Sequence, residues 1–355
     1  MANPADTASG RDGATSRRMR CTAAGPAPTR RALSMSLLMI AAPAILRAKP
    51  VGAAEANWPD RPIRLVVGFG PGGAGDITAR LLSPKLAEAL GRPVVVENRP
   101  GAGSIVAAET VARAQPDGHT WLLATNTTAT APALYNRLPF DPRRDFEFVS
   151  RVSFFDHVIA VAPDLPVRSL ADLAAFARAN PDQLNIGSIS VGNATHLGAA
   201  LLRTMLGAPD ATLVTYRGTP ELLNATATGQ VQVASEILPP ALPQIAAGRI
   251  RAIAIAAPER FARLPDVPTA AESGLPGYIV RSWNGIAVPA RTPRPIIERL
   301  NGEIVRIMAL PEIRERLLDI GVTPSTTTPE AFREFFDEEA TRWARVIADA
   351  GIERQ

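Results

Sequence analysis

The sequence predicts an α/β protein with two domains. From residue 58 onward, short apolar and β-branched runs alternate with segments of helical period, and this alternation is typical of βαβ units around a parallel sheet. The pattern restarts in the middle of the chain, which indicates a second unit. At 355 residues, the chain also exceeds the ~250–300 residues at which a single hydrophobic core stops growing.

The elements of the first unit follow closely on one another. The apolar run at 63–67 predicts a strand, residues 76–90 have a helical period, and 94–97 is again apolar and β-branched. After a glycine-rich loop, Ser104 is expected to cap a helix that reaches about residue 114. A third strand is predicted at 120–124.

In the second unit, Ser169 with Asp172 three residues later has the spacing that opens a helix with a side-chain cap. The next helix is predicted at 195–206. Apolar runs between and beyond these helices predict strands at 158–161, 184–187, 213–216, 231–236, 250–256 and 284–288. The end of the chain is mainly helical, and each helix opens on or near a proline, as first-turn positions allow: 293–308, 311–320 and 329–350.

Residues 1–56 have the composition of an export signal. Paired arginines precede the apolar run 32–46, and small residues follow it. The run is shorter than the ~20 apolar residues of a membrane span. We expect cleavage after Ala54 or Ala56, with Met19 as an alternative start, and a periplasmic chain that is not inserted in the membrane. TRRALS at 29–34 also resembles a twin-arginine signal, so this route and the general secretory route both stay open.

Most of the basic character belongs to this leader. Residues 1–56 hold eight of the 38 basic and three of the 34 acidic residues, so the rest of the chain has a net charge of about −1. The high pI therefore does not indicate a nucleic acid partner. The single cysteine, Cys21, lies in the leader too, and the processed chain is expected to have no disulfide.

The stretch GFGPGG at 68–73 lies between a predicted strand and a predicted helix. Gly68, Gly70 and Gly73 match the G-x-G-x-x-G pattern of dinucleotide sites, and Glu97 ends the next strand, where an acid would bind the ribose. The same glycines suit any strand-to-helix turn with a close backbone approach. In both interpretations a helix start presents backbone N–H groups to an anion.

Several motifs together resemble one family, the solute receptors of tripartite tricarboxylate transporters, also called the Bug family. They occur in the family's order from about residue 58 to 352: PIRLVV, PGG, VVVENRPGAG, AQPDGHT, LPDVPT and ESGLPG. The first loop of the family usually reads P-F-x-P-G-G-x-x-D. Gly68 and Gly70 are departures from that loop, so the resemblance argues against the nucleotide interpretation.

The resemblance implies a two-domain periplasmic binding protein of type II, in which the domains are joined by a two-strand hinge and close like a flytrap. Domain 1 would comprise 58–160 and 280–355, and domain 2 would comprise 161–279. The implied ligand is a small organic anion: a di- or tricarboxylate, an aromatic acid or an amino acid. The implied partners are membrane transporter subunits, with no catalysis and no cofactor. A carboxylate sensor of the same fold is an alternative.

Ligand contacts are expected from helix starts that face each other across the two domains. The first domain would offer the loop residues Phe69, Gly72, Gly73, Ala74, Gly75 and Asp76. The second domain has SISVGNATHL at 188–197, which resembles the family's S-x-G-x-G-[ST]-x-x-H-L loop and would offer Ser188, Ser190, Asn193, Thr195 and His196. Charged hydrogen bonds of roughly 1.5–3 kcal/mol each would together supply the about −8 kcal/mol of a micromolar ligand.

Further candidates each have a structural alternative. Asn126 lies in a hydroxyl-rich loop, TNTTAT at 125–130, which is either a polar turn or a ligand contact. Arg217 is either a ligand contact or a charge at the rim, and Trp283 is either cleft wall or core packing. Glu236 stands where many relatives have Asp. We hypothesise that it selects a ligand with an amino or hydroxyl group, although it could simply bond neighbouring backbone. Unchanged ligand preference in Glu236→Ala would refute this selection.

Enzyme signatures are incomplete. His119, His157 and His196 lack partners at metal-ligand spacing, and His196 beside serines is expected to be structural. SISVG at 188–192 lacks the first glycine of a G-x-S-x-G nucleophile turn. An exported NAD(P)-dependent oxidoreductase remains the second hypothesis, and NAD(P)H fluorescence would test it.

Overall fold

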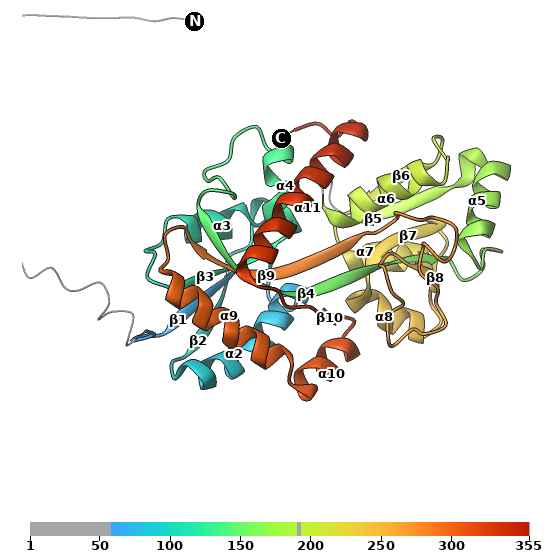
Figure 1. The fold of residues 1–355 in the computed structure, drawn as a ribbon. Helices are drawn as coiled ribbons and strands as arrows, with labels where there is room; N and C mark the ends of the chain where they lie inside the picture. Colours follow the sequence, from blue (N-terminus) through green and yellow to red (C-terminus); the bar gives the residue numbers. More distant parts are fainter. Residues whose placement is uncertain (1–57, 190–192, 355) are drawn as a thin grey trace, which may run out of the picture. The chain divides into compact units, whose positions relative to one another are not determined.

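The computed structural model describes residues 58–189 and 193–354. The predicted leader with Cys21, and the candidate Ser190, lie outside these residues. Figure 1 shows how the elements follow one another along the chain. The described strands are β1 (Ile63–Val67), β2 (Val94–Asn98), β3 (Thr120–Thr125), β4 (Phe146–Val161), β5 (Asn185–Ile189), β6 (Thr212–Tyr216), β7 (Val233–Ile237), β8 (Arg251–Ile255), β9 (Arg281–Pro289) and β10 (Thr323–Pro324).

Helices connect most of these strands, and three of them close the chain. In order they are α2 (Ala74–Leu90), α3 (Ile105–Ala112), α4 (Asn126–Leu134), α5 (Leu170–Ala179), α6 (Ala194–Met205), α7 (Thr219–Ala227), α8 (Leu238–Ala246), α9 (Arg294–Met308), α10 (Pro311–Asp319) and α11 (Pro329–Asp349), with short 3-10 turns η1 (Ala102–Ser104) and η2 (Pro181–Gln183). No helix in the described ranges is long and apolar enough to cross a membrane.

The described strands hydrogen-bond in the order β2-β1-β3-β9-β4-β7-β5-β6, with β8 and β10 also paired to β4. Outer pairs such as β1 with β2 and β3, or β5 with β6 and β7, are parallel. The sequence predicted parallel pairing throughout the sheet, but β9 and β4 run antiparallel to their neighbours. The fold is therefore a mixed α/β fold.

Strand β4 belongs to two groups of strands. Its first part pairs with β9 from Phe146↔Pro289 to Asp156↔Arg281, and its last part pairs with β7 and β8. We call β1, β2, β3, β9, β10 and the first part of β4 the first sheet half, and the remaining strands the second sheet half. Figure 1 shows β4 and β9 running side by side. The division into domains at 160 and 280 stays a prediction.

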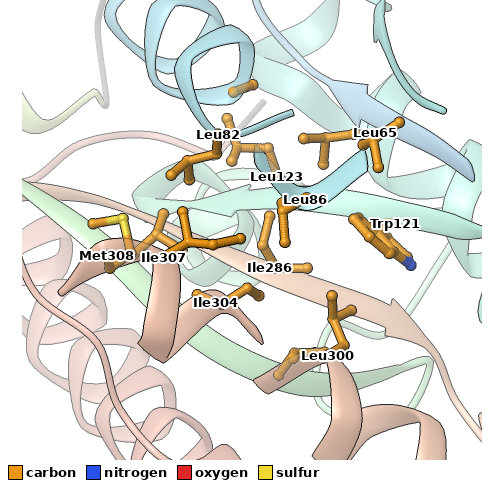
Figure 2. Close-up of a cluster of buried hydrophobic side chains, with 14 of the residues drawn as sticks. Leu65, Leu82, Leu86, Trp121, Leu123, Ile286, Leu300, Ile304, Ile307 and Met308 are labelled. Carbon is orange, nitrogen blue, oxygen red and sulfur yellow. The ribbon is translucent and has the colours of Figure 1, made fainter. Parts of the chain in front are cut away.

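The core of the first sheet half is formed by helices that cover the strands with leucine and isoleucine. Figure 2 shows Leu82 and Leu86 of α2 on one side, Leu300 and Ile304 of α9 on another, and Trp121 of β3 between them. All five side chains are buried. Fully burying one such side chain stabilises the fold by ~1.5–3 kcal/mol, so this cluster fixes α2 on the sheet and, with it, the position of its first turn.

An aromatic cluster holds the last helix against the paired strands. The Trp283 ring of β9 packs edge-on against the Phe332 ring of α11, with 5.6 Å between the ring centroids. Phe336, one turn further along α11, packs against Phe148 of β4 at 4.5 Å. Trp283 is 1% exposed. Its ring therefore belongs to the core, although the residue also borders the cavity described below.

Two local predictions were wrong. Residues 125–130 do not form a polar turn, because Thr125 ends β3 and residues 126–130 are the start of helix α4. Ser104 precedes α3 as predicted, but it has a φ of 74° and makes no side-chain cap bond. Its hydroxyl instead donates to the carbonyl oxygen of Gly68 at 3.3 Å. The loop after β2 is thereby tied to the loop after β1.

Candidate functional site

A cavity of about 200 Å³ lies where the two sheet halves meet beside β4 and β9. Its size is comparable to the about 150 Å³ of an engineered cavity that holds benzene, so it suits a small organic molecule. The described residues that line it come from both halves: Phe69, Gly73, Ala74, Gly75, Thr125, Asn126, Thr127, Phe155, Ile189, Asn193, Ala194, Thr195, Thr219, Glu236, Ile237, Ser282, Trp283 and Asn284.

Four helices begin at this cavity. The lining includes the first residues of α2, α4, α6 and α7. The first four N–H groups of a helix have no partner within it, and the helix dipole adds partial positive charge at this end. Glycines precede α2 and α7 and provide no side-chain cap. The cavity is therefore suited to an anion, although no lysine or arginine is among the lining residues.

The first turn of α6 is held by its own side chains. Asn193 Oδ1 accepts from His196 N–H at 3.0 Å and from the Thr195 hydroxyl at 2.6 Å. Thr195 also contacts the backbone of Ile189 at the end of β5 at 3.1 Å. These bonds fix the first turn of α6 against the end of β5, and they use the side-chain oxygens of two residues, Asn193 and Thr195, that the sequence put forward as ligand contacts.

The first turn of α4 is fixed on strand β9 by Asn126. This side chain is 6% exposed. Its Oδ1 accepts from Trp283 N–H at 2.8 Å, and its Nδ2 donates to the carbonyl oxygen of Arg281 at 3.1 Å. Asn126 lines the cavity, but its amide group is already used by the backbone of β9.

Asn284 contributes a buried donor without a partner. Its side chain is 2% exposed, and its Nδ2 has no hydrogen-bond partner among the described residues. A Cβ atom on Gly75, at the start of α2, would lie 3.5 Å from this nitrogen. Buried donors are normally satisfied, and an exception calls for an explanation such as a ligand. Asn284 Nδ2 and the first N–H groups of α2 thus offer donors at one end of the cavity.

Glu236 lies at the end of β7 and is the single ionisable side chain among the described lining residues. It is 0% exposed. Burial raises its pKa to about 7, although bonds from Ile237 N–H at 2.8 Å and from the Thr219 hydroxyl at 3.0 Å act in the opposite direction. An acid with this pKa changes its charge near neutral pH.

His157 lies behind the cavity on β4. Its Nε2 is 3.2 Å from the hydroxyl of the lining residue Ser282. The ring is fully buried, and burial lowers its pKa to about 3. His157 is therefore neutral near pH 7. Within the described ranges, no three His, Cys, Asp or Glu side chains come together as a metal ion would need.

The structure brings some of the predicted site residues to the cavity and places others elsewhere. At the cavity are Phe69, Gly73, Ala74, Gly75, Asn126, Asn193, Thr195 and Glu236. Gly72 lines a neighbouring groove, Arg217 is exposed outside the cavity, and Ser188 and His196 are buried away from the lining. These four, with Asp76, lie outside the lining.

Asp76 has a structural role that keeps its carboxylate occupied. It accepts from Gly72 N–H at 2.9 Å, from Asn98 Nδ2 at 2.8 Å and from Arg80 Nε at 2.9 Å. Burial would raise its pKa, but these bonds hold the pKa below its usual value. Asp76 therefore shapes the loop before α2 from behind, while the backbone of this loop faces the cavity.

The apparent dinucleotide fingerprint has a packing explanation. A Cβ atom at Gly68 would lie 2.3 Å from Ser104 Cβ, whereas one at Gly70 would have nothing within 4 Å. Glu97, the expected ribose acid, instead accepts from Arg64 at 2.9 Å and from Arg99 at 2.6 Å. The first glycine is thus required by the neighbouring loop, and the acid is paired.

A family comparison agrees with this geometry. Residues 78–352 match the model of the tripartite tricarboxylate transporter family receptor. The chain belongs to this receptor family. Protein BugT of Bordetella pertussis is 33% identical over 306 residues, which cover 86% of this chain and 93% of BugT. The chain therefore also belongs among the Bug proteins that the sequence motifs indicated.

Solved structures of relatives share the fold. Rpa4515 of R. palustris, determined with adipate, has a TM-score of 0.75 and 34% identity, and the match covers 84% of this chain and all of that one. MatC of Rhodopseudomonas palustris, determined with bound malate, has a TM-score of 0.70 and 34% identity over 82% of this chain and all of the other. The predicted binding-protein fold is confirmed by these receptors.

Some lining residues of this family member were not among the predicted contacts. Asn284 lies two residues after Ser282 in β9, and polar residues at alternate positions of a buried strand are a signal that both face one polar site. Thr219 follows the predicted Arg217 and starts a helix that was not predicted. Phe155 and Ile237 are apolar, and nothing in the sequence distinguishes them from core residues.

Proposed function

We propose that this protein is an extracytoplasmic receptor that binds a small carboxylate-containing metabolite and releases it unchanged. The observation that carries the proposal is the meeting of four helix starts from both sheet halves around one small cavity. Main-chain N–H groups at helix starts bind carboxylates without formal positive charge. The adipate and malate in the structures of relatives support the same ligand class for this chain.

The ligand would be held by backbone groups at the starts of α2 and α6, with Asn284 Nδ2 as a further donor. Charge-assisted hydrogen bonds of about 1.5–3 kcal/mol each can supply micromolar affinity from a few contacts. The predicted contacts Gly73, Ala74, Gly75, Asn193 and Thr195 belong to these helix starts. Water can bridge the remaining groups to the ligand, so the side chains alone do not name the acid.

A thermal-shift panel of small carboxylates, followed by calorimetry, tests this function. A ligand that binds the folded state raises the melting temperature by mass action. Asn284→Leu should weaken carboxylate binding about 10–100-fold, because it removes one bond of about 1.5–3 kcal/mol. Asn136→Ala, at an exposed position outside the cavity, is the control and should leave affinity unchanged. A panel without any carboxylate binder would refute the proposal.

Delivery to membrane subunits of a tripartite tricarboxylate-type transporter, from a periplasmic location, is the second part of the proposal. Family membership supports it. The test is uptake of a labelled carboxylate by vesicles that contain the membrane subunits, with and without the purified protein. Binding without stimulated uptake would favour a sensor of the same fold.

An NAD(P)-dependent oxidoreductase is the alternative activity. The pairing of Glu97 with Arg64 and Arg99 argues against a ribose contact. Purified protein should therefore leave NAD(P)H fluorescence unchanged, and a bound carboxylate should be recovered without chemical change.

A further inference from the structure

The cavity combines an anion site with an acid. Glu236 is fully buried beside helix starts that favour negative charge on a ligand, and the described lining residues include no cation to offset it. If Glu236 were ionised, a bound carboxylate would add a second negative charge to the same small, buried space. Two carboxylates that share a site do not both ionise readily, because each disfavours the charged form of the other.

The hydrogen-bonding groups around the cavity favour acceptors on the ligand. Asn126 Oδ1 already accepts from Trp283 N–H, and Asn193 Oδ1 accepts from His196 N–H and the Thr195 hydroxyl. The amide oxygens of Asn126 and Asn193 are thus already engaged by the protein. Donors are available, because Asn284 Nδ2 has no hydrogen-bond partner in the described part of the chain and four helices present their first N–H groups. Such a lining suits carboxylate groups better than amines.

The two oxygens of Glu236 are bonded in a way that a neutral acid can use. Oε1 accepts from the backbone N–H of Ile237, which always donates, so Oε1 acts as the carbonyl oxygen. Oε2 is 3.0 Å from the Thr219 hydroxyl, which can donate or accept. A proton on Oε2 therefore leaves every bond satisfied and gives the acid one O–H group to donate.

None of the described charged groups near Glu236 supplies a free positive charge that would stabilise its ionised form. The elements packed against β7 are β4, β5, α6, α7 and α8, and the last has no ionisable side chain. On β4, His157 is neutral near pH 7, and Asp156 is paired with Arg281. On α6, burial and Arg203 lower the pKa of His196. Arg217, which precedes α7, and Glu221 in its first turn are exposed.

We propose that Glu236 recognises the second carboxylate of a dicarboxylate ligand as a neutral acid, so that the protein takes up one proton together with the ligand. This inference rests on the proposed receptor function and narrows its ligand class. The bond formed is O–H···O⁻ from Glu236 to the ligand, and bonds of this kind are short and strong. The ligand's charge favours the protonated form further, so the proton stays bound in the complex.

Calorimetry with malate and adipate as probes tests the proposal. Each titration is run at pH 6, 7 and 8 in two buffers with different ionisation enthalpies, which gives the number of protons taken up. The second carboxyl group of a dicarboxylic acid titrates above the ~4 of a single carboxyl, because the first negative charge opposes its ionisation. The ligand is almost fully ionised at pH 7 and 8, and its own proton balance is subtracted at pH 6. We expect uptake to rise toward one proton at pH 8 and Kd to increase about fivefold from pH 7 to pH 8, because free Glu236 then has to be protonated.

Two variants complete the test. Glu236→Gln keeps one donor and one acceptor, so it should bind the dicarboxylate with no proton uptake and with a Kd independent of pH. Glu221→Gln makes the same charge change at an exposed position on α7 and should behave like the wild type. Monocarboxylates of equal length should bind more weakly, and the protein should take up no proton when it binds them.

The outcomes separate this inference from the receptor function. Dicarboxylate binding by the wild type without proton uptake would overturn the role of Glu236 and leave the receptor function standing. Preferential binding of an amino acid, lost in Glu236→Gln, would also overturn it, because the acid would then act in its ionised form. If no carboxylate binds at all, the receptor function fails and the inference fails with it.

Discussion

Asn126 and Trp283 are joined by a hydrogen bond of 2.8 Å from the Trp283 N–H to the Asn126 Oδ1, although 157 residues separate them. The same amide group donates to the carbonyl oxygen of Arg281. One side chain therefore satisfies two backbone groups of β9 and fixes the start of α4 at the cavity wall.

Replacing Asn126 by alanine should reduce the free energy of unfolding by about 2–6 kcal/mol. The change leaves a buried N–H and a buried carbonyl group without their partner, and each such loss costs roughly 1–3 kcal/mol. Urea denaturation measures the difference. Asn136→Ala removes an amide at an exposed position, and its stability should stay within about 0.5 kcal/mol of the wild type. Equal effects of the two variants would contradict the role given to Asn126.

Glu236→Gln should become more stable relative to the wild type as the pH rises. The pKa of Glu236 is about 7 in the folded protein against a usual 4.5, so its folded state holds a proton that the unfolded state has lost. The wild type therefore loses stability as the pH rises from about 4.5 to 7, by about 3 kcal/mol in total. Denaturation midpoints at pH 5 and 8 measure this, and a pH-independent difference would contradict it.

His157→Gln should make the free energy of unfolding depend less on pH on the acidic side, between pH 7 and 4. Burial lowers the His157 pKa from 6.5 to about 3, so the unfolded state gains a proton below pH 6.5 that the folded state does not. The stability contributed by neutral His157 is present above pH 6.5 and falls by about 3 kcal/mol by pH 4. The variant, which can keep a bond to Ser282, should lose correspondingly less stability between pH 7 and 4. Parallel profiles would refute this.

Gly68→Ala and Gly70→Ala form a matched pair within GFGPGG. The first places a methyl group against Ser104 and should cost about 1–3 kcal/mol through overpacking. The second meets no atom within 4 Å and should change stability by less than about 0.5 kcal/mol. Thermal denaturation of both variants provides the measurement. A large effect at Gly70 alone would mean that the loop has a requirement not visible in its packing.

Local signals predicted many elements of this fold. The Ser169 cap of α5 is present, because its side chain accepts from Asp172 N–H at 3.1 Å. Helix α10 begins at the predicted Pro311, and α9 and α11 also start where a proline was expected to open a helix. These features depend on neighbours within a few residues, which the sequence displays directly.

The elements that the sequence failed to predict depend on contacts between residues that are distant in the chain. Helix α4 contains several threonines and Pro132, which individually disfavour a helix, yet Asn126 and the core hold it in place. The first part of β4 was missed because register shifts at Phe148/Ser150 and Arg151/Ser153 interrupt the alternation of buried residues. The contact of Thr219 with Glu236 depends on a helix that was not predicted. Its effect on the acid could not be foreseen from the sequence.

Helix α11 limits how the two sheet halves can move. Phe332 and Phe336 near its start pack on β4 and β9, while Trp343 and Ile347 near its end belong to the core of the second sheet half. A helix of 21 residues is about 30 Å long, so α11 contacts both sheet halves along its length. A motion that separates the two sheet halves must therefore either leave α11 in contact with both or expose Trp343 and Ile347, which are buried here.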